Sequence, residues 1–127
     1  MAAFALAISY AAGMDAPLDL DALLASVGGD RELLDELAAA FVPEVPRWIT
    51  ALRDALLRGD AETIRRVAHG VSGSVGYFRA PGVRERAVDL EAMGREQRLD
   101  GAAAAIDRLE AALLELGRFL GQAPWRR

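Results

Sequence analysis

The chain has 127 residues, the length of one domain, and 53% of them are hydrophobic, which is enough to bury a core. It has no cysteine and one histidine, so disulfides and thiolate metal sites are excluded. The net charge of −4 gives no general attraction to nucleic acid or to anionic membranes, and all 15 basic residues are arginine.

The first 13 residues, MAAFALAISYAAG, form an apolar segment. The segment is shorter than the roughly 20 residues that span a bilayer, and it lacks the basic start of a secretory signal. An extra N-terminal helix, a translation start at Met14 and a remnant of an expression vector all remain open. We expect residues 1–17 to be an extension that is flexible or loosely docked.

Two helices are predicted in the first half of the chain. A short helix begins at Asp19 or Asp21 and ends at Val27, before a pair of glycines. Asp30 then caps a run of apolar residues at helical spacing that continues to about Arg58. Pro43 and Pro46 interrupt this run, but the apolar stripe stays in phase past both prolines. We therefore expect one helix that is kinked near residues 39–41.

Three further helices are predicted in the second half. Gly59 and Asp60 form a tight turn before a helix over residues 61–78. Pro81 opens the next helix, which ends near residue 97. Asp100 is expected to cap the last helix, which Gly121 and a following proline stop.

Together these patterns predict an all-α protein. Amphipathic helices joined by short loops favour an up-down-up-down antiparallel four-helix bundle, here with a short extra N-terminal helix. No segment alternates with the period of a strand. We assign the bundle to residues 18–121 and a C-terminal tail to residues 122–127.

The single histidine, His69, lies on the second of the four long helices that this pattern predicts, residues 61–78. Its helix has an apolar stripe formed by residues such as Ile64, Val71 and Val75, and His69 points roughly 140° away from the centre of that stripe. A buried histidine is therefore not expected. An inert surface histidine and a reactive, accessible one both fit the periodicity.

Gly73 and Gly76 lie on the same outward face as His69. A glycine inside a helix costs roughly 0.5–1 kcal/mol relative to alanine. Close packing between helices is one explanation for such glycines, but Gly73 points almost directly away from the apolar stripe. We interpret these two glycines as keeping the space beside His69 open for a partner.

The segment from Ala68 to Ser74, AHGVSGS, resembles the motif AH-x-L-K-G-S of histidine phosphotransfer (HPt) domains. The resemblance extends over residues 18–121 and includes the Gly59–Asp60 turn and the Leu90–Glu91 pair. It implies a four-helix bundle whose exposed histidine relays a phosphoryl group between receiver-domain aspartates. Carried onto this chain, it makes His69 the phosphoacceptor and Gly73 the gap that admits the receiver.

The resemblance also implies that the protein has no kinase activity and no cofactor of its own, with Mg²⁺ on the receiver. The expected partners are receiver domains of response regulators or hybrid histidine kinases, and neither nucleic acid nor membrane. We expect a cytoplasmic monomer. In related domains a Gln or Glu at the position of Glu91 holds the imidazole, although an ordinary carboxylate at the edge of the inner stripe would also fit this pattern.

Arg65 and Arg66 lie one turn before His69, about 40–60° to either side of it on the helical wheel. They are candidates for steadying the phosphoryl group or for pairing with acidic residues of a receiver; a solvated basic face is the alternative. Ser72 departs from the motif, because the family usually has lysine there. Serine supplies a hydrogen bond but no charge, which leaves open the rate and direction of transfer.

Three function classes follow from this sequence. The first is a phosphotransfer protein. The second is a non-phosphorylated adaptor that docks a receiver or a histidine kinase through the same face, which the missing lysine favours and His69 opposes. The third, a hydrolase or metalloenzyme, would need a second polar group beside His69, and only Glu62, two turns back, approaches that role.

Overall fold

The computed structural model describes residues 19–126, and all regular structure in that range is helical. The predicted N-terminal extension, residues 1–17, lies outside the described residues.

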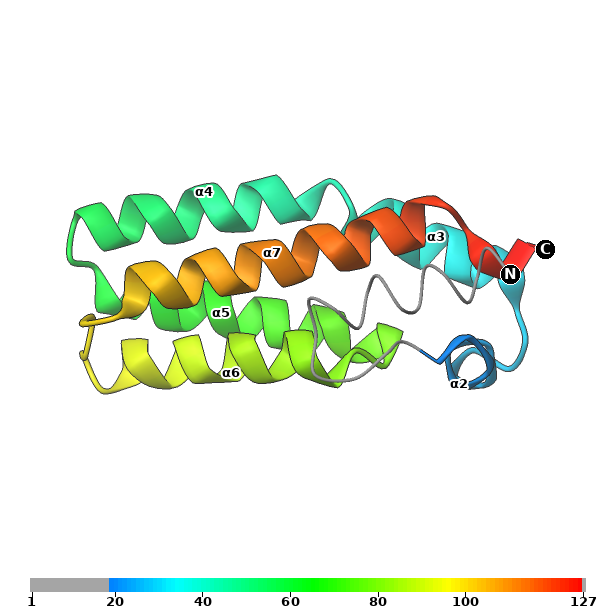
Figure 1. Ribbon diagram of the computed structural model, residues 1–127, viewed down its shortest axis with the longest axis horizontal. Coiled ribbons are helices and arrows are strands. Elements are labelled where there is room, and N and C mark those ends of the chain that lie inside the picture. Colours follow the sequence, from blue (N-terminus) through cyan, green and yellow to red (C-terminus); the bar gives the residue numbers. More distant parts are fainter. Residues whose placement is uncertain (1–18, 127) are drawn as a thin grey trace.

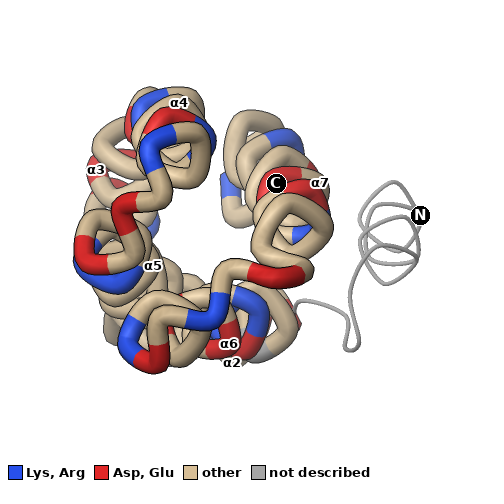
Figure 2. The backbone as a smooth tube through the Cα atoms, turned by 90° about the vertical axis from the view of Figure 1, so that its left-hand side faces the viewer, with Lys and Arg blue, Asp and Glu red and all other residues tan. Residues whose placement is uncertain are grey.

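Four long helices form the body of the molecule. They are α4 (Glu44–Leu57), α5 (Ala61–Val75), α6 (Pro81–Arg95) and α7 (Ala102–Gly121). Figure 1 shows that the axes of the four helices are roughly aligned, and Figure 2, which looks along the bundle, shows the helices arranged around a shared axis. Each helix packs against the next one along the chain, and α7 packs against α4. The predicted all-α helical bundle is confirmed, and the packing of its four long helices is consistent with the predicted up-down-up-down order.

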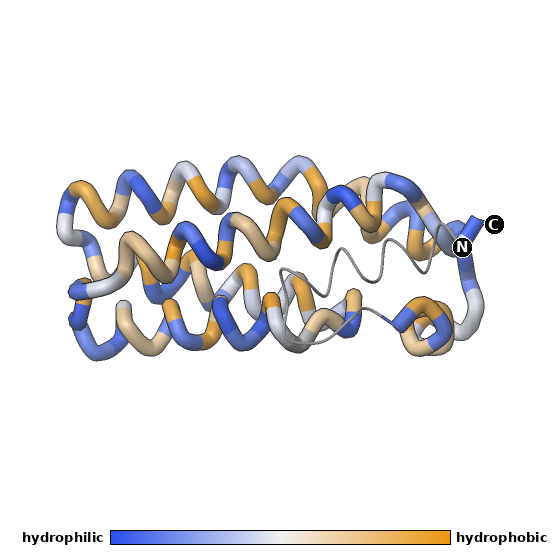
Figure 3. Tube along the Cα trace, in the orientation of Figure 1, coloured by the Kyte–Doolittle hydropathy of each residue, from blue (hydrophilic) through white to orange (hydrophobic). Residues whose placement is uncertain are grey.

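The core lies between these helices and consists mainly of aliphatic side chains. Each helix alternates hydrophobic and hydrophilic positions along its length (Figure 3), as expected for helices that bury one stripe. The fully buried side chains include Leu52, Ile64, Leu90, Ile106, Leu109, Leu113 and Leu116. Burying one such side chain contributes roughly 1.5–3 kcal/mol before conformational entropy is counted.

Two shorter helices precede the bundle. Asp19 caps α2 (Leu20–Ser26) by accepting a hydrogen bond from the backbone N–H of Ala22, and Asp30 caps α3 (Arg31–Phe41) in the same way through Leu33. Between them Gly28 and Gly29 take φ values of 64° and 77°, a conformation that glycine adopts at little cost. The short extra helix of the prediction corresponds to α2.

The prediction of one kinked helix over residues 30–58 is wrong, because the structure has two helices there, α3 and α4. The backbone N–H of Val42 still bonds to the carbonyl of Ala38, but Pro43 has no N–H to continue the ladder. Pro46 causes no break, because it lies in the first turn of α4, where an N–H would have no partner within the helix. The apolar stripe stays in phase because Val42 and Pro43 keep helical dihedral angles.

An aromatic cluster joins α3, α4 and the end of α5. The ring of Phe41 packs edge to face against Trp48, at a centroid distance of 5.5 Å, and against Phe78, at 5.1 Å. Phe78 belongs to a 3-10 turn, η1 (Gly76–Phe78), which ends the helix that was predicted to continue to residue 78. The cluster therefore fixes how α3 meets the bundle.

The helix ends around residues 95–102 differ from the prediction. Helix α6 begins at Pro81, as predicted, but ends at Arg95, two residues early, and Gln97 takes a positive φ of 55°. Asp100 does not cap α7. The N-cap is Gly101, whose φ of 82° turns the chain into the helix without a side-chain cap.

The segment predicted as a C-terminal tail packs against α3 as a second 3-10 turn, η2 (Pro124–Arg126). Trp125 is fully buried, and its indole Nε1–H donates to Asp35 Oδ1 at 2.9 Å. Arg126 pairs with the same carboxylate, and Arg31 donates to the Trp125 carbonyl at 2.6 Å. These bonds tie the end of the described chain to α3.

None of the helices within residues 19–126 has the length and apolar character needed to cross a membrane.

Candidate functional site

The helix that carries the histidine is well defined at its start. Asp60 accepts a hydrogen bond from the backbone N–H of Thr63 at 3.1 Å and another from the Thr63 hydroxyl at 2.6 Å. These bonds hold the pKa of the Asp60 carboxyl below its usual value. Gly59 takes a φ of 65° immediately before this cap. The predicted Gly59–Asp60 turn therefore starts α5 in the expected register.

That register places His69 on the outside of the bundle. Ile64, Ala68 and Val71 are completely buried on the inner face of α5, whereas 71% of the His69 side chain is exposed. An exposed imidazole is the orientation that the helical period predicts. The ring is thus accessible to a partner while its helix remains anchored in the core.

Glu91 of α6 lies beside the imidazole. Its Oε2 is 3.1 Å from His69 Nδ1, and only 12% of the Glu91 side chain is exposed. An ionised carboxylate only accepts hydrogen bonds, so this contact places the ring proton on Nδ1. The other nitrogen, Nε2, then carries the free lone pair of the exposed ring. The structure brings these two candidate residues together.

Arg95, one turn after Glu91 on α6, completes the arrangement. Its Nη2 donates to the same Glu91 Oε2 at 2.9 Å. Arg95 is not among the site residues predicted from the sequence. The available signal was the spacing of Glu91 and Arg95, since Glu and Arg four positions apart on a helix form ion pairs.

The two candidate glycines on this face border open space. A Cβ atom added at Gly73 or at Gly76 would meet no other atom within 4 Å. Neither glycine is therefore needed for contact between the described helices. Both leave open space on the surface beside His69. This geometry agrees with the expected open space beside His69.

The two candidate arginines lie on either side of this face. Arg65 makes two hydrogen bonds to Glu62, of 3.0 and 2.6 Å, which raise the pKa of Arg65 and lower that of Glu62. Arg66 donates to the Thr63 hydroxyl at 3.4 Å. Glu62 is thus occupied by Arg65, so it is not placed to act as a base on His69.

Ser72 is nearly buried. Only 7% of this residue is exposed, and its hydroxyl donates to the His69 carbonyl at 2.8 Å. The hydroxyl therefore bonds to its own helix backbone, a common arrangement for serine within a helix. The Ser72 position therefore supplies no cation, and its hydroxyl is engaged within the helix.

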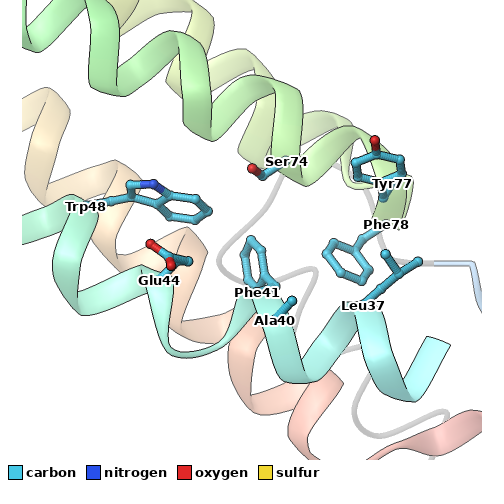
Figure 4. A pocket seen from close by; sticks show the side chains of 8 residues that line it. All are labelled: Leu37, Ala40, Phe41, Glu44, Trp48, Ser74, Tyr77 and Phe78. Atoms are coloured by element: carbon cyan, nitrogen blue, oxygen red, sulfur yellow. The ribbon is translucent and has the colours of Figure 1, made fainter. Parts of the chain in front are cut away.

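A small apolar cleft of about 150 Å³ lies near the end of α5. Figure 4 shows the rings of Phe41, Trp48 and Phe78 around it, with the Ser74 hydroxyl at its upper edge. Tyr77, which is 64% exposed, directs its hydroxyl away from α3. The cleft holds no titratable group other than Glu44 and Tyr77. It is therefore a surface feature rather than a second reactive centre.

Comparisons with known proteins give the same assignment as the residues. The family model of the Hpt domain matches residues 36–119, which is most of the chain. The chain therefore belongs to the Hpt domain family, and the resemblance drawn from the sequence is confirmed. A comparison with curated protein sequences gives no significant match.

Among solved structures, the chain is similar to the histidine-containing phosphotransfer protein B (HptB) from Pseudomonas aeruginosa PAO1. The TM-score is 0.78 with 24% sequence identity, over 87% of this chain and 96% of that one. At this identity the likeness establishes the shared fold. The helical bundle is thus that of an Hpt domain.

Proposed function

We propose that this protein is a histidine phosphotransfer protein that relays a phosphoryl group between receiver-domain aspartates through His69. The observation that carries the proposal is the pairing of His69 with Glu91. The carboxylate occupies Nδ1 at 3.1 Å, while 71% of the imidazole side chain stays exposed. An Hpt domain with such a histidine has the one group that the relay requires.

The transfer balances without a further reactant. The Nε2 lone pair attacks the phosphorus of a receiver's aspartyl phosphate, a new N–P bond forms, and the P–O bond to the aspartate breaks. The leaving electron pair returns to the receiver's carboxylate. The proton on Nδ1 stays between the ring and Glu91. Reversal of these steps delivers the phosphoryl group to a second receiver.

Charge neutralisation in this scheme comes mainly from the receiver, where we expect the Mg²⁺ ion. This chain contributes the approach surface: Gly73 and Gly76 leave room beside the ring. Arg65 and Arg66 flank it and are assigned to contact with the receiver's acidic residues. Glu62 holds the Arg65 side chain in place through two hydrogen bonds. Arg65 therefore offers the receiver a positive charge at a fixed position on the surface.

A receiver-binding adaptor that is never phosphorylated is the second candidate. Ser72 favours it, because this position lacks the cation that the family motif has there and its hydroxyl is engaged by the His69 carbonyl. The two candidates share a docking surface and differ only in whether His69 reacts.

The test is a phosphotransfer assay with receiver domains encoded in the same genome, each phosphorylated first in the presence of Mg²⁺. We expect label to move from at least one receiver to the wild-type protein, and the bond to be labile in acid and stable in base. His69→Gln should take up none. Binding of a receiver without transfer would support the adaptor. Equal labelling of the wild type and His69→Gln would refute the role of His69.

A further inference from the structure

Two hydrogen bonds converge on one oxygen atom beside the reactive ring. Glu91 Oε2 accepts from His69 Nδ1 at 3.1 Å and from Arg95 Nη2 at 2.9 Å. The carboxylate is largely buried, with 12% of its side chain exposed, whereas Arg95 is 60% exposed. The three residues therefore form a chain of hydrogen bonds from Arg95, through the largely buried Glu91 carboxylate, to the His69 imidazole.

A carboxylate at this position has a cost that a neutral amide would not have. A nearby negative charge favours the imidazolium form of a histidine, which lacks the lone pair needed for attack. The same charge repels the oxygens of a phosphoryl group arriving at the ring. Glu91 alone would orient His69 but would also disfavour the step that the orientation serves.

Arg95 offsets this charge. Its guanidinium is always protonated, and it is bonded to the same oxygen that holds the ring. On α5, Arg65 makes two hydrogen bonds to Glu62 and is also attracted electrostatically to Glu91, and Arg66 bonds to Thr63. Just after α6, Arg98 pairs with Glu96. Among these arginines, Arg95 alone bonds to Glu91.

We propose that Arg95 is a positioning residue that anchors Glu91 and balances its charge, so that a Glu–Arg pair does here what a neutral hydrogen-bond acceptor would do alone. The proposal rests on the relay function only for its effect on phosphotransfer. Its effect on the state of the imidazole is independent of any partner. Arg95 acts through Glu91, so its importance should disappear when Glu91 is made neutral.

The test uses the fact that the chain has one histidine, so ¹⁵N labelling of histidine gives the signals of one imidazole ring. We compare the wild type with Arg95→Gln, Arg95→Lys, Glu91→Gln and the double variant at pH 7. The wild type should show a ring proton on Nδ1, which faces Glu91. Arg95→Gln should increase the doubly protonated fraction severalfold, since the carboxylate is then unbalanced.

The remaining variants make the result specific. Arg95→Lys keeps the charge and should restore the wild-type ring populations. In the Glu91→Gln background, Arg95→Gln should change the ring populations much less, because no carboxylate charge is left unbalanced. Arg98→Gln removes another arginine ion pair, three residues further on and more exposed, and is the control that should leave the ring populations unchanged. An Arg95→Gln ring identical to the wild type, or one altered equally in both backgrounds, would overturn the proposal.

Phosphotransfer provides the second readout. Arg95→Gln should slow phosphorylation of His69 roughly tenfold, the scale of one charge-assisted hydrogen bond. The same change in the Glu91→Gln background should have less than about a twofold effect. A tenfold loss in both backgrounds would show that Arg95 acts without Glu91, and would refute the coupling. If no variant accepts phosphate but the ring populations follow the scheme, the relay function fails and the positioning role stands.

Discussion

Gly94 of α6 lies directly against the backbone of Arg65 on α5. A Cβ atom at Gly94 would stand 2.6 Å from the Arg65 backbone nitrogen and 2.7 Å from the Ala61 carbonyl oxygen. These atoms belong to helix backbone, so they cannot turn aside. The close approach brings α6 near enough for Glu91, one turn earlier, to reach His69, one turn after Arg65.

Gly94→Ala should therefore force α5 and α6 apart. We expect a loss of about 1–2 kcal/mol in the free energy of unfolding, since overpacking outweighs the gain in helix propensity. The contact between Glu91 and His69 should lengthen as well. The matched control is Gly73→Ala, where a Cβ meets no atom within 4 Å; it should raise stability by roughly 0.5–1 kcal/mol. Denaturant unfolding of both variants checks this, and an unchanged or more stable Gly94→Ala would show that the two helices readjust freely.

Gly73→Leu should abolish phosphotransfer while the protein stays folded. The new side chain would extend from open surface on the outward face of α5 and would block a receiver from His69. The measurement is transfer from a phosphorylated receiver, with circular dichroism and thermal unfolding as the check on the fold. Full transfer activity in a folded Gly73→Leu protein would refute the access role of this glycine.

Ser72→Lys tests the departure from the family motif. A lysine would place a cation near the phosphoryl group and should speed transfer by less than about tenfold, with a smaller effect at high salt. Because Ser72 is nearly buried, the lysine stem has to pass along the helix surface to reach solvent, so we also expect some loss of stability. Ser72→Ala, which adds no charge, should not speed transfer. Equal rates for wild type and Ser72→Lys at low salt would show that the missing lysine is incidental.

The sequence was sufficient for the bundle and for the exposure of His69, because both follow from the helical period of apolar residues. It was also sufficient to propose Glu91, through the family motif. It was not sufficient for Gly94, whose closeness to Arg65 depends on how two helices pack. The break at Pro43 was missed because the apolar stripe continues through residues that keep helical dihedral angles without the hydrogen-bond ladder.

The contact between Trp125 and Asp35 was missed for a different reason. The two residues are separated by 90 positions, and no local pattern marks such a pair. Gly101 was missed as the start of α7 because Asp100 has the residue type that most often caps a helix. In each case the deciding contact or backbone conformation is set by tertiary structure.

The Asp35 site predicts an acid-sensitive contribution to stability. Two hydrogen bonds lower the pKa of Asp35 below its usual value. The larger effect comes from Arg126 and the smaller one from the Trp125 indole. A lowered folded-state pKa means that the contribution is complete above the unfolded pKa of about 3.9 and is lost as the pH falls through the folded value. Asp35→Asn should therefore be less stable than the wild type at pH 7, and this difference should shrink below about pH 4.

Asp60 and Glu62 also have lowered pKa values, so the wild type and the variant both lose their contributions in acid. The difference between the two proteins isolates Asp35. Thermal unfolding at pH 7 and at several values below about 4 measures it. A difference that stays constant over this range would show that the Asp35 charge has no part in holding the C-terminal turn.

The contact between Glu91 and His69 Nδ1 leads to the most specific prediction: if His69 is the phosphoacceptor, we expect the phosphoryl group to bond to Nε2. The decisive measurement is the site of phosphorylation after transfer from a receiver. Tandem mass spectrometry locates the modified residue, and ³¹P and ¹⁵N NMR of the phosphorylated protein distinguish the two ring nitrogens. We predict a single phosphoryl group on Nε2 of His69, whereas a phosphoryl group on Nδ1, or on any other residue, would contradict this mechanism.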